Sequence, residues 1–188
     1  QTALSRSKPF FDASFGPSAK TLLQAQDPFA RAAAYQIIGI AQDVRQLPLL
    51  VKGMDEETLQ VKREVLIAMG RLGDPSVEPL VRRYMIKGSE KLLALAVLKR
   101  LGCADILPKA MPLYSDALQR QARLKSGRLA VWDTLHGGTS FKLTPAARRE
   151  AEADYKRMRL LEAANRFDLE YFAESLKVMT EADEVALV

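Results

Sequence analysis

Two side chains in this 188-residue sequence are candidates for chemistry because each is the only one of its type: Cys103 and His136. A thiolate activated by an imidazole is a nucleophile, and both groups can bind metals. One cysteine and one histidine are too few for an internal disulfide, a common structural zinc site or a histidine-rich di-iron centre. We therefore expect no metal site. Because no histidine lies in its part of the chain, Cys103 is expected to be a small buried side chain rather than a nucleophile.

The sequence contains no motif of a known catalytic or cofactor site. It has no glycine-rich phosphate loop ending in Lys and Ser or Thr, no G-x-S-x-G elbow and no dinucleotide fingerprint. His136, Gly137 and Gly138 superficially resemble an oxyanion loop, but no nucleophile on a strand-to-helix turn accompanies them. We expect no catalytic residue, no cofactor and no small-molecule substrate, and hence a protein that is not an enzyme.

The composition favours a helical domain. Aromatic residues make up only 7% of the chain, and glycine and proline together only 19 of its 188 residues, which disfavours a β-sandwich or barrel. No apolar run reaches the roughly 18 to 20 residues that span a bilayer, so the sequence predicts a soluble protein without a membrane span. The chain begins at Gln1, which fits either a fragment or a mature form after removal of a targeting segment. The compartment stays unassigned.

Three segments repeat one pattern, and they run from Asp27 to Gly53, from Leu59 to Gly88 and from Ser89 to Tyr114. Asp27-Pro28 and Asp74-Pro75 are helix-start signals, with a capping side chain followed by a proline in the first helical turn. Apolar residues then recur every three or four positions. Each segment also has a proline at the start of its second half, so it predicts two helices joined by a short turn; these prolines are Pro48, Pro79 and Pro108.

The best-formed repeat, VKREVLIAMGRLGDPSVEPLV from Val61 to Val81, resembles HEAT-like repeats of the phycobilisome-lyase type. The resemblance covers Asp27 to Tyr114. It implies an all-α fold, a short α-solenoid of about three HEAT-like helix pairs. From charge and apolar spacing we expect a long C-terminal helix from Pro145 and a shorter last helix from Asp168. The predicted organisation is an irregular segment with a capping helix (1–26), repeats (27–125), a basic loop (126–144) and C-terminal helices with an acidic tail (145–188).

Aligning the repeats brings charged residues into two columns, which predict a structural ladder of ion pairs between repeats. The basic column contains Arg31, Lys62 and Lys91, and the acidic column contains Asp43 and Asp74. Cys103 replaces the acid in the third repeat.

The flanking segments contain the candidate partner-binding residues. Aromatic side chains near the N-terminus and in the predicted loop are of the type that anchors interfaces. The residues from Gln119 to Pro145 have a net charge of +4, which suggests an electrostatic rim around the loop. The candidate residues are Phe10, Phe11, Phe15, Arg120, Arg123, Lys125, Arg128 and Trp132.

These features favour a non-catalytic scaffold for protein–protein interactions, an adaptor or accessory subunit that binds other protein subunits of a larger assembly. The alternative is a helical-repeat protein that binds the nucleic-acid backbone, since the sequence pI is about 9.4. A net charge of only +5 and the absence of interleaved aromatic residues count against it. The resemblance implies a second alternative, a chromophore-lyase-like accessory protein.

Overall fold

Helices are the only regular structure in the part of the chain that the computed structural model describes, residues 16–87, 90–137 and 143–186. The all-α fold class is thereby confirmed. The α-helices are α2 (Gly16–Leu23), α3 (Pro28–Ala41), α4 (Leu47–Glu56), α5 (Leu59–Leu72), α6 (Glu78–Lys87), α7 (Lys91–Arg100), α8 (Leu107–His136) and α9 (Pro145–Ala186). Short 3-10 turns precede α4, α6 and α8; they are η3 (Val44–Gln46), η4 (Pro75–Val77) and η5 (Ala104–Ile106). Within these ranges, no helix has the length and apolar character needed to cross a membrane.

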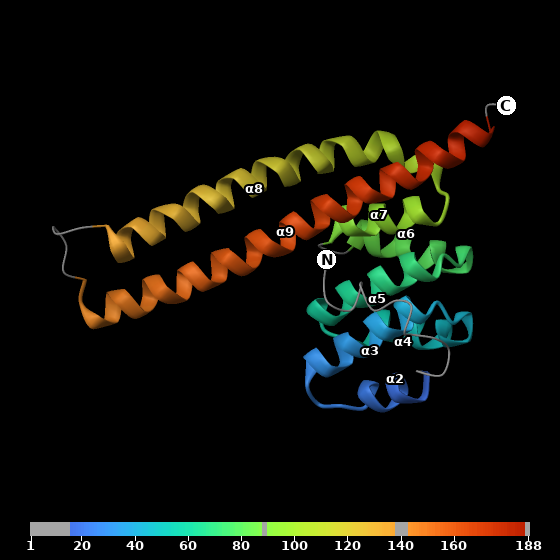
Figure 1. Ribbon diagram of the computed structural model, residues 1–188, viewed down its shortest axis with the longest axis horizontal. Helices are drawn as coiled ribbons and strands as arrows, with labels where there is room; N and C mark the ends of the chain where they lie inside the picture. Colours follow the sequence, from blue (N-terminus) through green and yellow to red (C-terminus); the bar gives the residue numbers. More distant parts are fainter. Residues whose placement is uncertain (1–15, 88–89, 138–142, 187–188) are drawn as a thin grey trace.

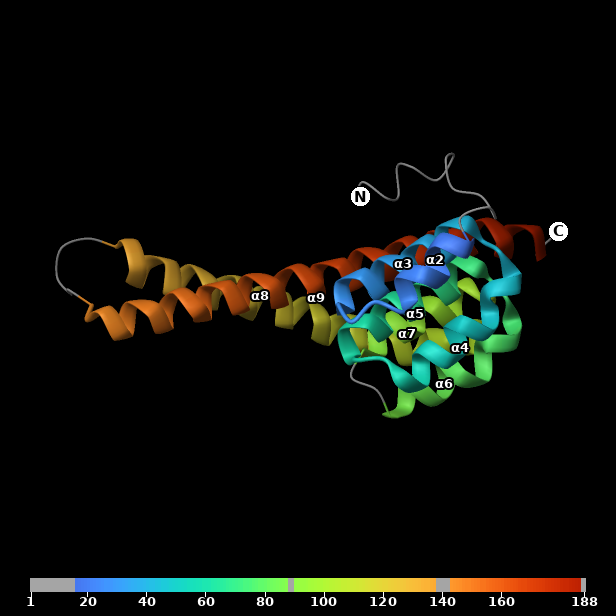
Figure 2. The same ribbon diagram turned by 90° about the horizontal axis from the view of Figure 1, so that it is seen from below.

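Five helices form one row. Along it α2 contacts α3, α3 contacts α5, α5 contacts α7 and α7 contacts α9 (Figure 1). Helices α4 and α6 pack against α5 and α7 on one side of this row (Figure 2). Helix α8 contacts α7 at its start and then runs antiparallel to α9, far beyond the other helices (Figure 1). The molecule therefore consists of a row of packed helices, the body, and a projecting hairpin of α8 and α9.

The predicted capping residues begin and end helical segments largely as the sequence indicates. The carboxylates of Asp27 and Asp74 each accept a hydrogen bond from the backbone amide two residues on, at 3.0 and 2.9 Å. After α5 and α7 the backbone turns into the left-handed region at Gly73 and Gly102, with φ of 71° and 86°. Glycine adopts these angles without steric cost, so it ends a helix cleanly. Gln42 takes the same role after α3, with φ of 53°.

The core is centred on α5 and α7. All residues from Leu92 to Lys99 are buried, because α7 is enclosed by α5, α6, α8 and α9. Helices α3 and α5 approach closely at Gly39, where a Cβ atom would lie 2.7 Å from the Cα of Ala68. Packing this tight leaves no room for a side chain. Gly39 therefore sets the spacing between these two helices.

The prediction of a loop at 126–144 is wrong for most of the residues of this segment that the structure describes. Helix α8 runs without interruption from Leu107 to His136, so it includes residues 126–136 and passes through Pro112. Gly127, which resembles a helix breaker, lies against α9 instead, where a Cβ atom would meet the sulfur of Met158 at 3.3 Å. Contact with a neighbouring helix outweighs the unfavourable helix propensity of one glycine, about 1 kcal/mol. Residues 138–142 lie outside the described ranges.

The expected start of a last helix at Asp168 is also wrong. Helix α9 is a single helix of 42 residues from Pro145 to Ala186, and Asp168 lies in its middle. Its carboxylate binds Arg63 of α5 rather than capping a new helix. The side chain is thus bound to a distant helix, a role that local sequence does not indicate.

Candidate interaction surface

A cluster of partly buried charges fixes α9 to the body. Arg63 of α5 donates from Nη2 to Oδ1 of Asp168 at 2.6 Å and from Nη1 to Oε2 of Glu90 at 2.5 Å. The side chains are only 13 to 19% exposed. Burial alone would lower the pKa of Arg63, but the hydrogen bond to Asp168 and its charge outweigh it and raise that pKa. The cluster joins α5, the start of α7 and α9, and so helps to set the direction of the hairpin.

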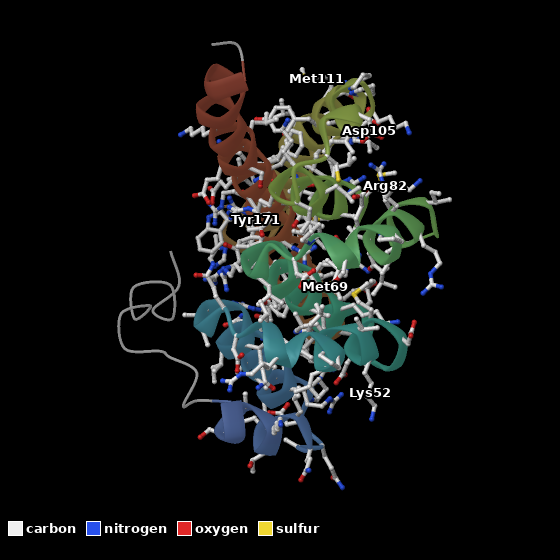
Figure 3. The ribbon with its side chains drawn as sticks, turned by 90° about the vertical axis from the view of Figure 1, so that its right-hand side faces the viewer. Lys52, Met69, Arg82, Asp105, Met111 and Tyr171 are labelled. Carbon is white, nitrogen blue, oxygen red and sulfur yellow. The ribbon has the colours of Figure 1, made fainter. Side chains whose placement is uncertain are left out.

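A second contact lies two turns further along α9. The guanidinium of Arg100 on α7 stacks 4.5 Å from the ring centroid of Tyr171 and donates from Nε to Oγ of Ser175 at 3.0 Å. The Tyr171 hydroxyl lies beside Gly70, where a Cβ atom would approach it to 2.8 Å (Figure 3). Burial raises the pKa of Tyr171, so this phenol stays neutral at physiological pH.

Within the hairpin, polar and aromatic contacts fix the register of the two helices. Asn165 of α9 is buried and donates from Nδ2 to the carbonyl of Ala117 and to Oε1 of Gln121, both at 2.9 Å. The rings of Tyr114 and Phe172 pack with their centroids 5.5 Å apart. Because a buried amide needs its hydrogen bonds, sliding one helix along the other would be costly.

The outer half of the hairpin is held by Arg128 and by an aromatic cluster. Nε of Arg128 on α8 lies 2.5 Å from Oε2 of Glu162 on α9. Trp132 stacks on His136 with ring centroids 3.8 Å apart and packs against Tyr155 of α9 at 5.5 Å. These contacts fix the indole while leaving it 43% exposed.

One exposed side of α8 carries a regular stripe of residues, which we call the outer stripe; at its far end Trp132 and His136 also border α9. Its members recur at alternating spacings of four and three residues, the period of a coiled-coil seam. Four of them are large apolar side chains, with exposures of 60% for Met111, 48% for Leu118, 44% for Leu129 and 43% for Trp132. The sequence analysis found only Trp132, although the spacing could have revealed the others. The complete stripe is Met111, Ser115, Leu118, Ala122, Lys125, Leu129, Trp132 and His136.

The expected basic rim divides into two groups. Arg123 and Lys125 are exposed on α8, next to the apolar residues of the outer stripe. Arg128 is bound to Glu162, and Arg120 lines a polar cavity of about 90 Å³ together with Asp168 and other residues. Arg128 therefore belongs to the internal contacts of the hairpin, whereas Arg120 is exposed at the rim of this cavity. The other predicted anchors, Phe10, Phe11 and Phe15, lie outside the described residues.

Arg31 of the predicted basic column forms an ion pair, but with Glu57 and not with a residue of the predicted acidic column. Arg31 donates from Nε to Oε1 of Glu57 at 2.8 Å and from Nη1 to the carbonyls of Ala25 and Gln26 at the end of α2. The equivalent residue in the next repeat is Arg63, not Lys62. Each arginine lies in the first turns of one helix and binds an acid just before the next helix in the row.

The predicted acidic column caps turns instead of pairing with the basic column. Asp43 accepts hydrogen bonds from Arg45 and Gln46, and the first of these is the main cause that lowers its pKa to about 2. Asp74 accepts a hydrogen bond from the amide of Ser76 at the start of η4, and its pKa is lowered first by the Ser76 side chain and then by that amide. Asp43 and Asp74 are therefore local helix caps. Lys91, the last residue of the predicted basic column, lines the same polar cavity as Arg120.

Cys103 and His136 lie too far apart to act together. Cys103 precedes α8 and His136 is its last residue, so about 45 Å of helix separates them. The thiol is 7% exposed, and burial is the main cause that raises its pKa. His136 has its ring on Trp132 and Nδ1 3.1 Å from the Trp132 carbonyl oxygen.

The described surface also has a groove away from the outer stripe. A groove of about 300 Å³ lies between α4 and α6, lined by Met54, Asp55, Leu80, Arg83 and Tyr84. Among the described residues, no three His, Cys, Asp or Glu side chains converge as metal ligands. No protein-family model, curated protein or solved structure matches the chain. The outer stripe extends along most of α8, from Met111 to His136.

Proposed function

We propose that this protein is a non-catalytic interaction scaffold, an adaptor or accessory subunit of a larger multiprotein assembly. Its docking surface is the outer stripe of α8. The observation that carries the proposal is the alignment of Met111, Leu118, Leu129 and Trp132 on one exposed side of a projecting helix. Isolated exposed apolar residues are ordinary, but a continuous row of them is typical of a surface that a partner covers.

Trp132 is suited to anchor a partner. Tryptophan is enriched among the residues that contribute most binding energy at interfaces. The indole already packs on His136 and Tyr155, so little side-chain freedom is left to lose when a partner binds. This preorganisation favours a specific contact over loose adhesion.

The helix row supports the proposal if it is a short HEAT-like α-solenoid, as the sequence resemblance implies. In such folds each helix pair packs on the next, and the last pair is left with an uncovered side. In that arrangement α8 would be the second helix of the third repeat, with its outer stripe toward the place of a further repeat. A partner helix would take that place.

The test compares proteins recovered with the full chain from lysates of the cells that produce it. Leu129→Glu and Trp132→Ala are expected to abolish the recovery of a partner. Ile86→Glu is the matched control, because Ile86 is 71% exposed on α6 and lies outside the stripe. Equal recovery with wild type, control and both stripe variants would refute the proposal.

Binding to the nucleic-acid backbone stays a second candidate because Arg123 and Lys125 are exposed on α8. Such binding depends steeply on salt, since phosphate contacts release counterions. Fluorescence anisotropy with single-stranded and duplex oligonucleotides at low and high salt tests it. Absence of binding at low salt would eliminate this candidate.

A further inference from the structure

We propose that the partner on the outer stripe is α8 of a second copy of this chain, packed antiparallel about a twofold axis. The inference rests on the proposed function, because it uses the same surface. It follows from the pattern of large and small residues along the stripe, which is complementary to itself.

The stripe has the length and period of a coiled-coil seam. From Met111 to His136 it covers 26 residues, or about 39 Å of helix. Met111, Leu118, Lys125 and Trp132 are seven residues apart, and a second set starting at Ser115 follows the first by four residues. All eight positions are exposed, so no rearrangement of the chain is needed to pair them.

The antiparallel register follows from placing the axis midway between Ala122 and Lys125. Leu118 of one copy then faces Leu129 of the other, and Trp132 faces the small Ser115. Lys125 faces Ala122, again a long side chain against a small one. The remaining pair, Met111 with His136, closes both ends. Every member of the stripe has a counterpart: Trp132 and Lys125 fit over the small Ser115 and Ala122, while the larger side chains of the other two pairs pack against each other.

Other registers match less well. Parallel helices would set Trp132 against Trp132 and Ser115 against Ser115, which crowds one layer and leaves a gap in another. A shift of the antiparallel register by seven residues would leave one end of each stripe uncovered. The full antiparallel overlap is therefore the arrangement in which the stripe buries the most apolar surface.

The body of the molecule does not block this pairing. Ala110 and Ala117 of α8 are buried toward the rest of the fold, whereas Met111 and Leu118 point away from it. Helix α8 forms one edge of the molecule in Figure 1, and Met111 lies at the end of the row opposite α2 in Figure 3. In the dimer, the tip of one hairpin lies beside the base of the other.

Lys125 gives the dimer a characteristic response to salt. The two Lys125 residues are about 4.5 Å apart along the helix axes, on either side of the twofold axis. Their like charges oppose association, so salt strengthens the dimer by screening them. An acidic protein or a nucleic acid on the same stripe would respond in the opposite way, since salt weakens attraction between opposite charges.

The size of the stripe predicts a weak dimer. A contact about 39 Å long and about 10 Å wide covers on the order of 800 Å² summed over both copies. Specific stable interfaces bury about 1,200–2,000 Å². The dimer is therefore expected to form in the micromolar range and above, with a fraction that depends on protein concentration.

The first experiment is sedimentation of the full chain from about 10 µM to about 1 mM, at about 0.05 M and about 0.5 M salt. We expect a monomer–dimer equilibrium that is tighter at high salt. Leu129→Glu raises the dissociation constant by at least about 100-fold, because each dimer has two such sites. Lys125→Leu lowers it by about tenfold and removes the salt dependence. Leu160→Glu is the matched control, since Leu160 is 71% exposed on α9 rather than on the stripe, and it leaves the constant unchanged.

The second experiment tests the register by oxidation of engineered cysteines in a Cys103→Ser background. Leu118→Cys and Leu129→Cys proteins form a disulfide only when mixed, because the two Leu118 positions are about 16 Å apart along the axis. Cross-linking of Leu118→Cys with itself indicates parallel helices and overturns the proposal. The proposal is also overturned if the chain is a monomer at every concentration. If the chain is monomeric but Leu129→Glu abolishes recovery of another protein, the second copy is excluded while the proposed function stands.

Discussion

Arg63 on α5 and Asp168 on α9 are 105 residues apart in the sequence, yet Nη2 of the first lies 2.6 Å from Oδ1 of the second. The same guanidinium binds Glu90, at the start of α7. Three helices of the row thus meet at one arginine. This contact is the structural basis for the direction of α9, and through α9 for the placement of the outer stripe.

Arg63→Ala is predicted to destabilise the protein strongly. It leaves two carboxylates in a site where the side chains are at most 19% exposed, and an uncompensated buried charge costs about 3–5 kcal/mol. The control is Arg148→Ala, which removes the ion pair between Arg148 and Glu152. Because the Arg148 side chain is 61% exposed, this variant should lose less than about 0.5 kcal/mol of stability. The free energy of unfolding in urea measures both, and equal losses would contradict a special role for Arg63.

Gly39→Ala is predicted to destabilise the contact between α3 and α5. The added methyl would lie 2.7 Å from the Cα of Ala68, and a backbone atom cannot move aside, so we expect a loss of about 1–3 kcal/mol. Gly127→Ala is the control in another helix, because its methyl would meet only the flexible end of Met158, at 3.3 Å. That variant should keep or gain stability, by up to about 1 kcal/mol from helix propensity. Thermal or urea unfolding distinguishes the two, and a similar loss in both would disprove the close-packing explanation.

Asp43 is predicted to make the free energy of unfolding depend on pH in the acidic range. Hydrogen bonds from Arg45 and then from Gln46 lower its pKa from 3.8 to about 2 in the folded protein. A lowered folded-state pKa stabilises the fold above the unfolded-state value, and the contribution disappears as the pH falls through about 2. Wild type should therefore be more stable than Asp43→Asn at pH 7, and the difference should shrink between about pH 4 and pH 2.

Arg45→Ala supplies the matched test of the cause. Without the guanidinium, the main hydrogen-bond donor to Asp43 is lost, so the pKa of Asp43 should return toward its ordinary value. The difference from Asp43→Asn should then be small across the pH series. A difference as large as in the wild-type background would assign the effect to another residue.

The sequence predicts the local features of this fold well because each depends on neighbouring residues. Asp27-Pro28 and Gly73 determine a helix start and a helix end through their own backbone and side chains. Gly39 and Gly70, 31 residues apart, mark equivalent positions in two repeats, and each accepts a close neighbour in the structure.

The long-range contacts could not be predicted in the same way. A helix turns by about 100° per residue, so the one-residue difference between Lys62 and Arg63 moves the charge to another side of α5. The partner of Arg63 lies on a helix for which repeat alignment gives no register. The loop prediction failed for a related reason, since the packing of Gly127 against Met158 depends on α9. The spacing of Leu118, Leu129 and Trp132 is visible in the sequence, but only the structure shows that α9 leaves these side chains exposed.

Cys103 provides a last prediction, about reactivity. Burial raises the pKa of this thiol, and acidic neighbours, first among them Glu78, raise it further. At pH 7 to 8 the reactive thiolate is therefore scarce, and the 7% exposure also limits access of a reagent. We expect Cys103 to react with a disulfide reagent far more slowly in the native protein than in urea. The matched control is Leu129→Cys in a Cys103→Ser background, whose exposed thiol on α8 should react quickly in both conditions. Rapid modification of native Cys103 would show that the thiol is accessible and would reopen the nucleophile interpretation.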